Sequence, residues 1–240
     1  GATLMLFDGS PAHPDTGALW RLVEEQGVTF FGTSARYIHT LQAGETRPAR
    51  FGLPKLRTVA STGSPLSPGG FEYVYRYIKE DVHLASISGG TDIVSCFMLG
   101  VPTLPVHAGQ IQAPGLGVDL AAFDEEGREV EGEPGELVCR QPLPSMPLGF
   151  WGDEDGSRYR QAYFTRYPGV WHHGDRIEFT PEGGVVVHGR SDATLNPGGV
   201  RIGTAEIYAP LDAVPEVIEA AAVGRREAGE EEVWLFVVLR

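Results

Sequence analysis

Short apolar runs alternate with helical periodicity over the first hundred residues. Runs rich in β-branched and aromatic residues predict buried strands at TLMLF (3–7), VTFFGTS (28–34), LRTVAST (56–62) and VHLASIS (82–88). Apolar residues spaced three and four apart predict intervening helices, marked by Leu19, Leu22 and Val23 up to Gly27, then by Tyr37, Ile38 and Leu41, and then from Ser67 onward. This alternation indicates right-handed βαβ units and a parallel sheet, so the fold class is α/β.

Glycine- and proline-rich turns separate short strands from about residue 110 to residue 190. The tetrads DEEG and PEGG are typical of hairpin turns, and they join alternating runs at 117–130, 135–141 and 176–190. This pattern predicts an antiparallel, barrel-like sheet. After Asp192 the pattern changes again, to a Pro-Gly-Gly turn, a helix and a strand within residues 197–223.

Asp192 is therefore the predicted linker between two parts of the chain. Residues 1–192 are expected to belong to a large domain, with a βαβ region at 1–109 and a β-rich region at 110–192. Residues 193–240 are expected to begin a small α+β domain. Because both ends fall in what read as buried strands, TLMLF and VWLFVVLR, we expect an internal fragment of a longer polypeptide.

Composition excludes several classes of function. Nineteen Lys and Arg against 32 Asp and Glu give a net charge of −13, which repels nucleic acid and anionic lipid. No apolar run approaches the roughly 20 residues that span a bilayer. Cys96 and Cys139 fit no metal-ligand spacing, so free thiols and a cytoplasmic location are expected.

Two small-residue loops are candidates for binding a ligand, because ligands of parallel sheets bind beyond the carboxyl ends of the strands. STGSPLSP (61–68) offers flat backbone to a ring, or is an ordinary turn before a helix that Ser67 caps. SGGTD (88–92) places a hydroxyl and a carboxylate after two glycines. Thr91 suits a phosphate oxygen and Asp92 suits Mg²⁺, although a turn with Asp at a helix start fits the same pattern.

Two further segments carry candidate binding groups. In WHHGD (171–175), His172 and His173 point to opposite faces of a strand, which disfavours a metal site, while Asp175 could accept hydrogen bonds from a ribose diol. Arg190 and Arg201 flank the Asp192 linker, and each guanidinium could hold a phosphate or carboxylate or form a surface ion pair.

Together these segments resemble the adenylate-forming acyl-CoA synthetases. GRSDATLNPGGVRIGTAEI (189–207) is similar to the hinge motif of that family. Three earlier segments occur in the family's order, GATLMLFDGSP, STGSPLSP and SGGTD, so the resemblance extends along the whole chain. The resemblance implies ATP, Mg²⁺ and CoA as substrates or cofactors. It also implies a phosphate loop and an adenylation lysine, neither of which occurs within the 240 residues.

The resemblance implies a role for each matching residue. The adenine side would be lined by Gly63, Ser64 and Pro65, next to Gly89 and Gly90. The remaining roles would be phosphate contact for Thr91, Mg²⁺ binding for Asp92 in place of the family's glutamate, ribose binding for Asp175, ribose or phosphate binding for Arg190, the hinge for Asp192, CoA passage for Gly199 and phosphate contact for Arg201.

Within the family, SISGGTDIVSCF and PTLPVHAGQIQ resemble the acetoacetate-specific branch. Acetate-using relatives carry tryptophans where this chain has Ser88, Gly89 and Gly90, so the resemblance implies room for a longer acyl chain. Three alternatives stay open: an acetyl- or propionyl-CoA synthetase, a non-catalytic nucleotide-binding remnant, and a metal-dependent hydrolase built on the WHHGD segment.

Overall fold

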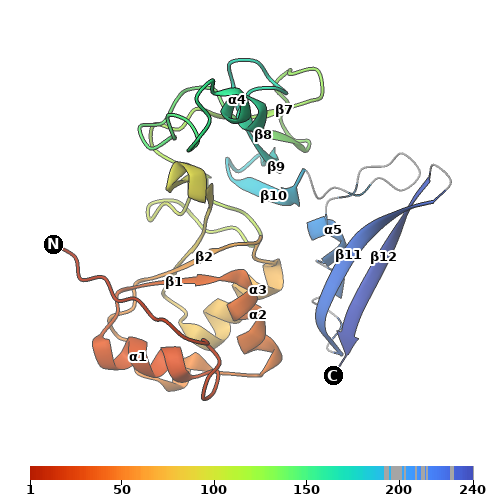
Figure 1. Ribbon diagram of the computed structural model, residues 1–240. Coiled ribbons are helices and arrows are strands. Elements are labelled where there is room, and N and C mark those ends of the chain that lie inside the picture. The colour runs from red at the N-terminus through yellow and green to blue at the C-terminus, as the bar shows by residue number, and fades with distance from the viewer. Residues whose placement is uncertain are drawn as a thin grey trace.

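The fold consists of a parallel sheet with helices, an antiparallel body of two sheets and a two-stranded ribbon (Figure 1). The computed structural model describes residues 1–191, 195, 202, 204–208, 210, 211, 214, 216–227 and 230–239. The parallel and antiparallel bodies confirm the predicted mixed α/β class.

The parallel sheet has the order β1-β2-β3, with every pair parallel. Its strands are β1 (Phe30–Ser34), β2 (Thr58–Thr62) and β3 (His83–Ser86). Helix α1 (Ala18–Gln26) precedes the sheet, and the segments that connect its strands are α2 (Ala35–Ala43) and η1 (Pro48–Arg50), then α3 (Pro68–Tyr73) with its π-helical continuation η2 (Val74–Ile78). One core joins the helices to β2 and β3, and Trp20, Ile38, Leu41, Val59 and Leu84 lie in it.

The predicted helix signals operate as expected. Helix α1 buries Leu19, Trp20 and Val23 on one face and ends at Gly27, whose backbone is left-handed. Helix α3 begins after Ser67, whose hydroxyl accepts a hydrogen bond of 3.3 Å from the Gly70 N–H. These caps fix where each helix starts or ends, and hence where the loop after each strand lies.

The antiparallel body contains two sheets that share a core. One has the order β10-β9-β8-β7 and the other the order β4-β5-β6. The elements are β4 (Ser88–Gly90), η3 (Thr91–Ile93), β5 (Ser95–Leu99), β6 (Ala113–Pro114), β7 (Leu120–Phe123), β8 (Gly135–Cys139), α4 (Ser157–Tyr163), β9 (Trp171–Phe179) and β10 (Val185–Arg190). Residues 180–184 join β9 to β10 as the predicted hairpin turn.

The end of the described chain forms α5 (Thr204–Tyr208), β11 (Val217–Glu227) and β12 (Glu230–Leu239). The two strands pair antiparallel along their length. The Tyr208 hydroxyl accepts a hydrogen bond of 2.9 Å from the Ala222 N–H, which fastens α5 to the ribbon. A helix followed by a strand agrees with the sequence prediction for this part.

Two predictions about buried strands are wrong. Residues 3–7 form no strand, and Leu4 and Leu6 are more than 80% exposed. Residues 230–239 do form a strand, but Phe236 is 55% exposed. Apolar composition predicts which residues favour a strand, whereas burial requires a neighbouring layer. Within the described residues, β12 pairs with β11 alone.

The cysteine prediction holds for the described chain, where Cys96 and Cys139 are both free thiols. Cys96 lies on β5 and Cys139 on β8, two strands that belong to different sheets. Burial raises the pKa of both thiols. None of the described helices combines the length and the hydropathy needed to cross a bilayer.

Replacing a core leucine should cost far more stability than replacing an exposed one. Leu41→Ala removes a fully buried side chain from the core of the parallel body and should lower the free energy of unfolding by about 2–5 kcal/mol. Leu116→Ala, at a fully exposed position, is the matched control and should change it by less than about 0.5 kcal/mol. Urea denaturation measures both, and equal losses would contradict the assigned core.

Candidate functional site

The two predicted ligand loops lie next to each other at the carboxyl ends of neighbouring parallel strands, although residues 88–90 of the second one form the short strand β4. Residues 63–65 directly follow β2, and the segment 88–92 follows β3, its parallel neighbour. The Ile87 N–H donates a hydrogen bond of 2.9 Å to the Ser61 carbonyl, which ties the two strand ends together. The expected position of both loops is confirmed.

The first loop presents backbone to solvent. Gly63, Ser64 and Pro65 are exposed, and Gly63 has a φ of +87°. Buried residues anchor the loop on both sides, with Ser61 before it and Leu66 after it. The Ser61 hydroxyl is buried without a hydrogen-bond partner among the described residues. The loop is therefore an open backbone surface on a firmly packed base.

Close packing requires both glycines of the second loop. A Cβ on Gly89 would lie 2.1 Å from the Ser95 carbonyl oxygen, and a Cβ on Gly90 would lie 2.6 Å from the His173 ring. The space that side chains would take at these two positions is thus filled by backbone and by imidazole. The predicted room for a longer acyl chain does not lie on the Cβ side of either glycine.

Thr91 and Asp92 begin the short turn η3 and are exposed. The Tyr163 hydroxyl donates a hydrogen bond of 2.6 Å to Asp92 Oδ2, and the Tyr163 ring stacks on Trp171 with centroids 3.6 Å apart. Burial and then the neighbouring carboxylate raise the pKa of Tyr163, so the hydroxyl keeps its proton and holds one oxygen of Asp92. The sequence analysis missed Tyr163, whose only signal is its place in an aromatic-rich helix.

Strain accompanies this turn. Val94, which ends η3, has a φ of +50°, a left-handed conformation that is an outlier for a β-branched residue, and it is 84% exposed. Such a conformation costs on the order of 1–3 kcal/mol and persists where the surroundings enforce it. The exposed Val94 lies between two fully buried residues, Ile93 before it and Phe97 after it.

The two adjacent histidines point to different partners, as predicted for a strand. His172 Nε2 lies 2.9 Å from Glu136 Oε2, whereas His173 packs on Gly90 and on Phe97, whose ring centroid is 4.7 Å from its own. Burial, followed by the charge of Arg190, lowers the pKa of His173 to about 4. Within the described chain, no group of three or more His, Cys, Asp or Glu residues could hold a metal ion.

Asp175 and Arg190 meet on neighbouring strands. Arg190 Nη1 lies 3.7 Å from Asp175 Oδ1 and donates a hydrogen bond of 3.1 Å to the His173 carbonyl. Gly174, with a φ of +83°, permits this approach, because a Cβ there would lie 2.9 Å from Arg190 Nη2. Asp175 is buried while Arg190 stays half exposed, so the pair can present a cation beside a carboxylate.

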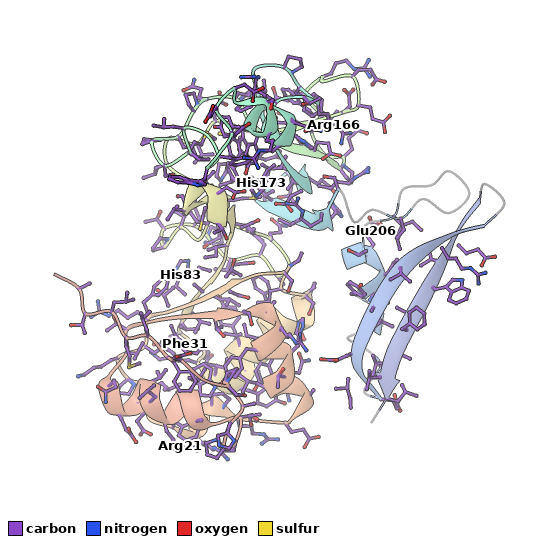
Figure 2. The ribbon with its side chains drawn as sticks, viewed as in Figure 1. Arg21, Phe31, His83, Arg166, His173 and Glu206 are labelled. Carbon is purple, nitrogen blue, oxygen red and sulfur yellow. The ribbon has the colours of Figure 1, made fainter. Side chains whose placement is uncertain are left out.

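His173 joins this pair to the second loop. Its ring lies against Gly90, and its neighbours Gly174 and Asp175 carry the contact with Arg190. Figure 2 shows His173 at the edge of the antiparallel body that faces the parallel sheet, with Arg166 farther away on the same body. The structure therefore brings the Gly89–Gly90 pair close to the strands that carry Asp175 and Arg190, more than 80 residues later in the sequence.

Glu136 is a buried carboxylate that the sequence analysis did not select. It accepts hydrogen bonds from His172 and from the Ser191 hydroxyl, and Arg166 Nη1 lies 2.8 Å from its Oε1. Burial alone would raise the pKa of Glu136, but these donors and the Arg166 charge outweigh it and lower the pKa below its ordinary value. The available signal was a single carboxylate inside the apolar run GELVC.

Three predicted site residues, Asp192, Gly199 and Arg201, lie outside the described residues. Leu195 and Ile202, which lie on either side of the Pro-Gly-Gly sequence, are described and pair through two backbone hydrogen bonds of 2.9 and 2.8 Å.

The buried His173 should make stability depend on pH. The imidazole binds a proton near pH 6.5 in the unfolded chain and only near pH 4 in the folded one, so stability present above pH 6.5 is lost between these values. At about 1.36 kcal/mol per pKa unit, this loss amounts to about 3 kcal/mol.

Urea unfolding of the parent chain and of His173→Gln at several pH values between 7.5 and 4.5 measures this loss. The stability difference between the two proteins should shrink as the pH falls. The exposed His107→Gln is the matched control for the loss of one imidazole. A difference that stays constant with pH would show that His173 is not held neutral by burial.

Comparison with known proteins agrees with this geometry. Acetoacetyl-coenzyme A synthetase of Rhizobium meliloti (strain 1021) is 56% identical over 240 residues, covering 100% of this chain and 37% of that protein. The structure of acetoacetyl-CoA synthetase from Streptomyces lividans is 49% identical with a TM-score of 0.87, covering 97% of this chain and 36% of that one. The chain thus spans little more than a third of the length of these relatives.

A more distant structure shares the fold alone. Anthranilate CoA ligase AuaEII in complex with anthranoyl-AMP is 22% identical, with a TM-score of 0.82 over 100% of this chain and 43% of that one. The family model described as AMP-binding enzyme matches residues 1–151, a span that includes both ligand loops and the turn that carries Asp92. The chain belongs to the AMP-binding enzyme family.

Proposed function

We propose that the complete product of the gene encoding this chain is an ATP-dependent ligase. It would activate acetoacetate as an acyl-adenylate with release of pyrophosphate, and then transfer the acyl group to CoA to give acetoacetyl-CoA and AMP. The observation that carries this proposal is the contact of the 88–92 segment with the strand of the Asp175–Arg190 pair through His173, beside the loop 63–65 on the neighbouring parallel strand. Sequence identities of 56% and 49% to two acetoacetyl-CoA synthetases, over 100% and 97% of this chain, support the choice of substrate.

Each group would perform a role suited to its geometry. The exposed backbone of Gly63, Ser64 and Pro65 offers a flat surface to the adenine ring. Thr91 would contact the α-phosphate. A carboxylate can accept two hydrogen bonds, so Asp175 would hold the ribose hydroxyls, while the half-exposed guanidinium of Arg190 would bind ribose or phosphate oxygens.

Asp92 would be the protein ligand of Mg²⁺. The ion commonly binds proteins through one or two carboxylates together with substrate phosphates, so a single exposed Asp fits this mode. When bound, Mg²⁺ would neutralise phosphate charge. The Tyr163 hydroxyl holds Oδ2 and so orients the carboxylate, which leaves Oδ1 for the ion.

The domain boundary belongs to the same proposal. We place it at Asp192, with residues 1–192 in the large domain and 193–240 beginning the small one. Asp192 would be the hinge between the two half-reactions, Gly199 would let the CoA arm pass close to backbone, and Arg201 would serve the phosphate during adenylation. A cytoplasmic location, where ATP and CoA are available, completes the proposal.

Two alternatives differ in what they predict. Another short-chain acyl-CoA synthetase would favour acetate or propionate, and the filled space beside Gly89 and Gly90 is the observation in its favour. A nucleotide-binding protein without catalysis would bind adenylate but form none.

A panel of acids distinguishes these functions. Acid-dependent exchange between ATP and labelled pyrophosphate, measured on the complete gene product, should give a kcat/KM for acetoacetate at least roughly tenfold above those for acetate and propionate, the discrimination expected from one or two groups in a fitted pocket. A preference for acetate or propionate would favour the other synthetases. No exchange with any acid would favour the binding protein.

Ligand binding tests the site itself. A non-hydrolysable acetoacetyl-adenylate analogue at a hundredfold excess over its Kd should stabilise the protein by about 2.7 kcal/mol, seen as a raised Tm. Arg190→Ala should lose most of this shift because it removes the cation beside Asp175.

The matched control is Arg128→Ala, an exposed arginine paired with Asp124 in a hairpin turn of the same body. It should keep the full shift. Equal shifts in the two variants would remove Arg190 from the proposed site.

A further inference from the structure

Glu136 connects three segments of the antiparallel body through one carboxylate. It lies on β8, in a strand whose five residues are all buried. His172 reaches it from β9, Arg166 from the loop that follows α4, and Ser191 from the end of β10. These contacts use donors from segments well separated in the chain.

An ionised carboxylate in such a place requires a reason. Burying a charge is costly unless it is paired and hydrogen-bonded, and a well-packed apolar side chain would commonly serve stability as well. Glu136 satisfies both oxygens, with Oε1 on Arg166 and Oε2 shared by His172 and Ser191. This geometry holds particular partners in place, which an apolar residue would not do.

The regular sheet ladder is interrupted where these partners lie. The pairing of β8 with β9 shifts between Glu136 and Val138, and the pairing of β10 with β9 shifts between Val187 and Gly189. After its shift the β10–β9 pairing resumes at Gly189 and ends with Arg190 opposite Asp175. Ser191 lies just beyond this ladder, so strand pairing constrains it less than a residue inside a continuous ladder. Side-chain bonds can supply the missing constraint.

Ser191 receives two such constraints. Its N–H donates a hydrogen bond of 2.8 Å to the Gly174 carbonyl, and its hydroxyl donates to Glu136. One bond comes from β9 and the other from β8, so they fix both the position and the rotation of the residue. The preceding residue is Arg190, whose guanidinium must lie beside Asp175 and over Gly174.

We infer that Glu136 is a positioning residue for the nucleotide site: through the Ser191 hydroxyl it holds the end of β10 so that Arg190 stays beside Asp175. This inference rests on the proposed function, since it assigns to Arg190 and Asp175 the binding of an adenylate. Glu136 itself need not touch the ligand.

Two substitutions at Ser191 test the inference with little disturbance of the fold. Ser191→Ala removes the hydroxyl and leaves Glu136 paired with His172 and Arg166, while Ser191→Thr keeps a hydroxyl. The Kd of the non-hydrolysable acetoacetyl-adenylate analogue is measured by calorimetry on the complete gene product. Ser191→Ala should raise the Kd about tenfold, as expected for one hydrogen bond to a charged group, and Ser191→Thr should restore it to within about threefold of the parent.

Glu136→Gln is a second test, made with Glu178→Gln as the matched control. Glu178 pairs with His188 at 3.0 Å between β9 and β10, so the control removes a similar acid–imidazole contact in the same sheet. Glu136→Gln should weaken binding of the analogue at least as much as Ser191→Ala does, and Glu178→Gln should leave the Kd within about twofold. The pair of Ser191 variants decides the question if Glu136→Gln does not fold.

The outcomes separate the inference from the proposed function. A parent protein that does not bind the analogue would overturn the proposed function and leave nothing for Glu136 to position. A parent protein that binds, with Ser191→Ala binding equally well or Ser191→Thr impaired as much as Ser191→Ala, would overturn the inference alone. A change in Tm of the free protein without a change in Kd would show a purely structural role and would also overturn it.

Discussion

The packing of His173 against Gly90 is the contact on which the site depends. It joins the segment that leaves the parallel sheet to the strand that carries Asp175. The contact is possible because position 90 has no side chain and because the imidazole, held neutral by burial, can lie in an apolar setting beside Phe97. A larger residue at 90, or a charged one at 173, would separate the two bodies at the point where the candidate binding groups meet.

The charged side chains around this contact belong to an acidic protein, in which 19 Lys and Arg stand against 32 Asp and Glu. The net charge of −13 would repel an anionic ligand, so attraction must be local. The structure meets this need with Arg190, held half exposed beside a buried carboxylate. A second buried carboxylate, Glu136, forms an ion pair with Arg166. It also accepts a hydrogen bond from Ser191, the residue that follows Arg190. The described part of the candidate site thus combines buried carboxylates with the half-exposed guanidinium of Arg190.

Hydrogen bonds from aromatic and hydroxyl side chains complete the arrangement. Tyr163, fixed by stacking on Trp171, sets the orientation of Asp92, and Ser191 links the end of β10 to β8. Each of these side chains contacts or adjoins a residue of the proposed site, Asp92 in one case and Arg190 in the other. Val94 adopts a left-handed backbone that a β-branched residue disfavours, so the intrinsic preference of Val94 does not account for the turn that carries Asp92.

Short-range patterns in the sequence predict most strands and helices of the parallel body and the place of the two candidate ligand segments, although the strand expected at 3–7 does not form. Periodicity located the helices capped by Ser67 and ended by Gly27, and the rule that ligands bind beyond parallel strands located 63–65 and 88–92, since both depend on short-range patterns. Tertiary structure alone decided what is buried and what meets. The strand at 230–239 is exposed because burial depends on a covering layer, and the filled space at Gly89 comes from β5, six residues away in the chain. The pairing of Glu136 with Ser191 joins residues 55 positions apart. Local propensity acts over a few residues, whereas such contacts are fixed only when separate strands pack together.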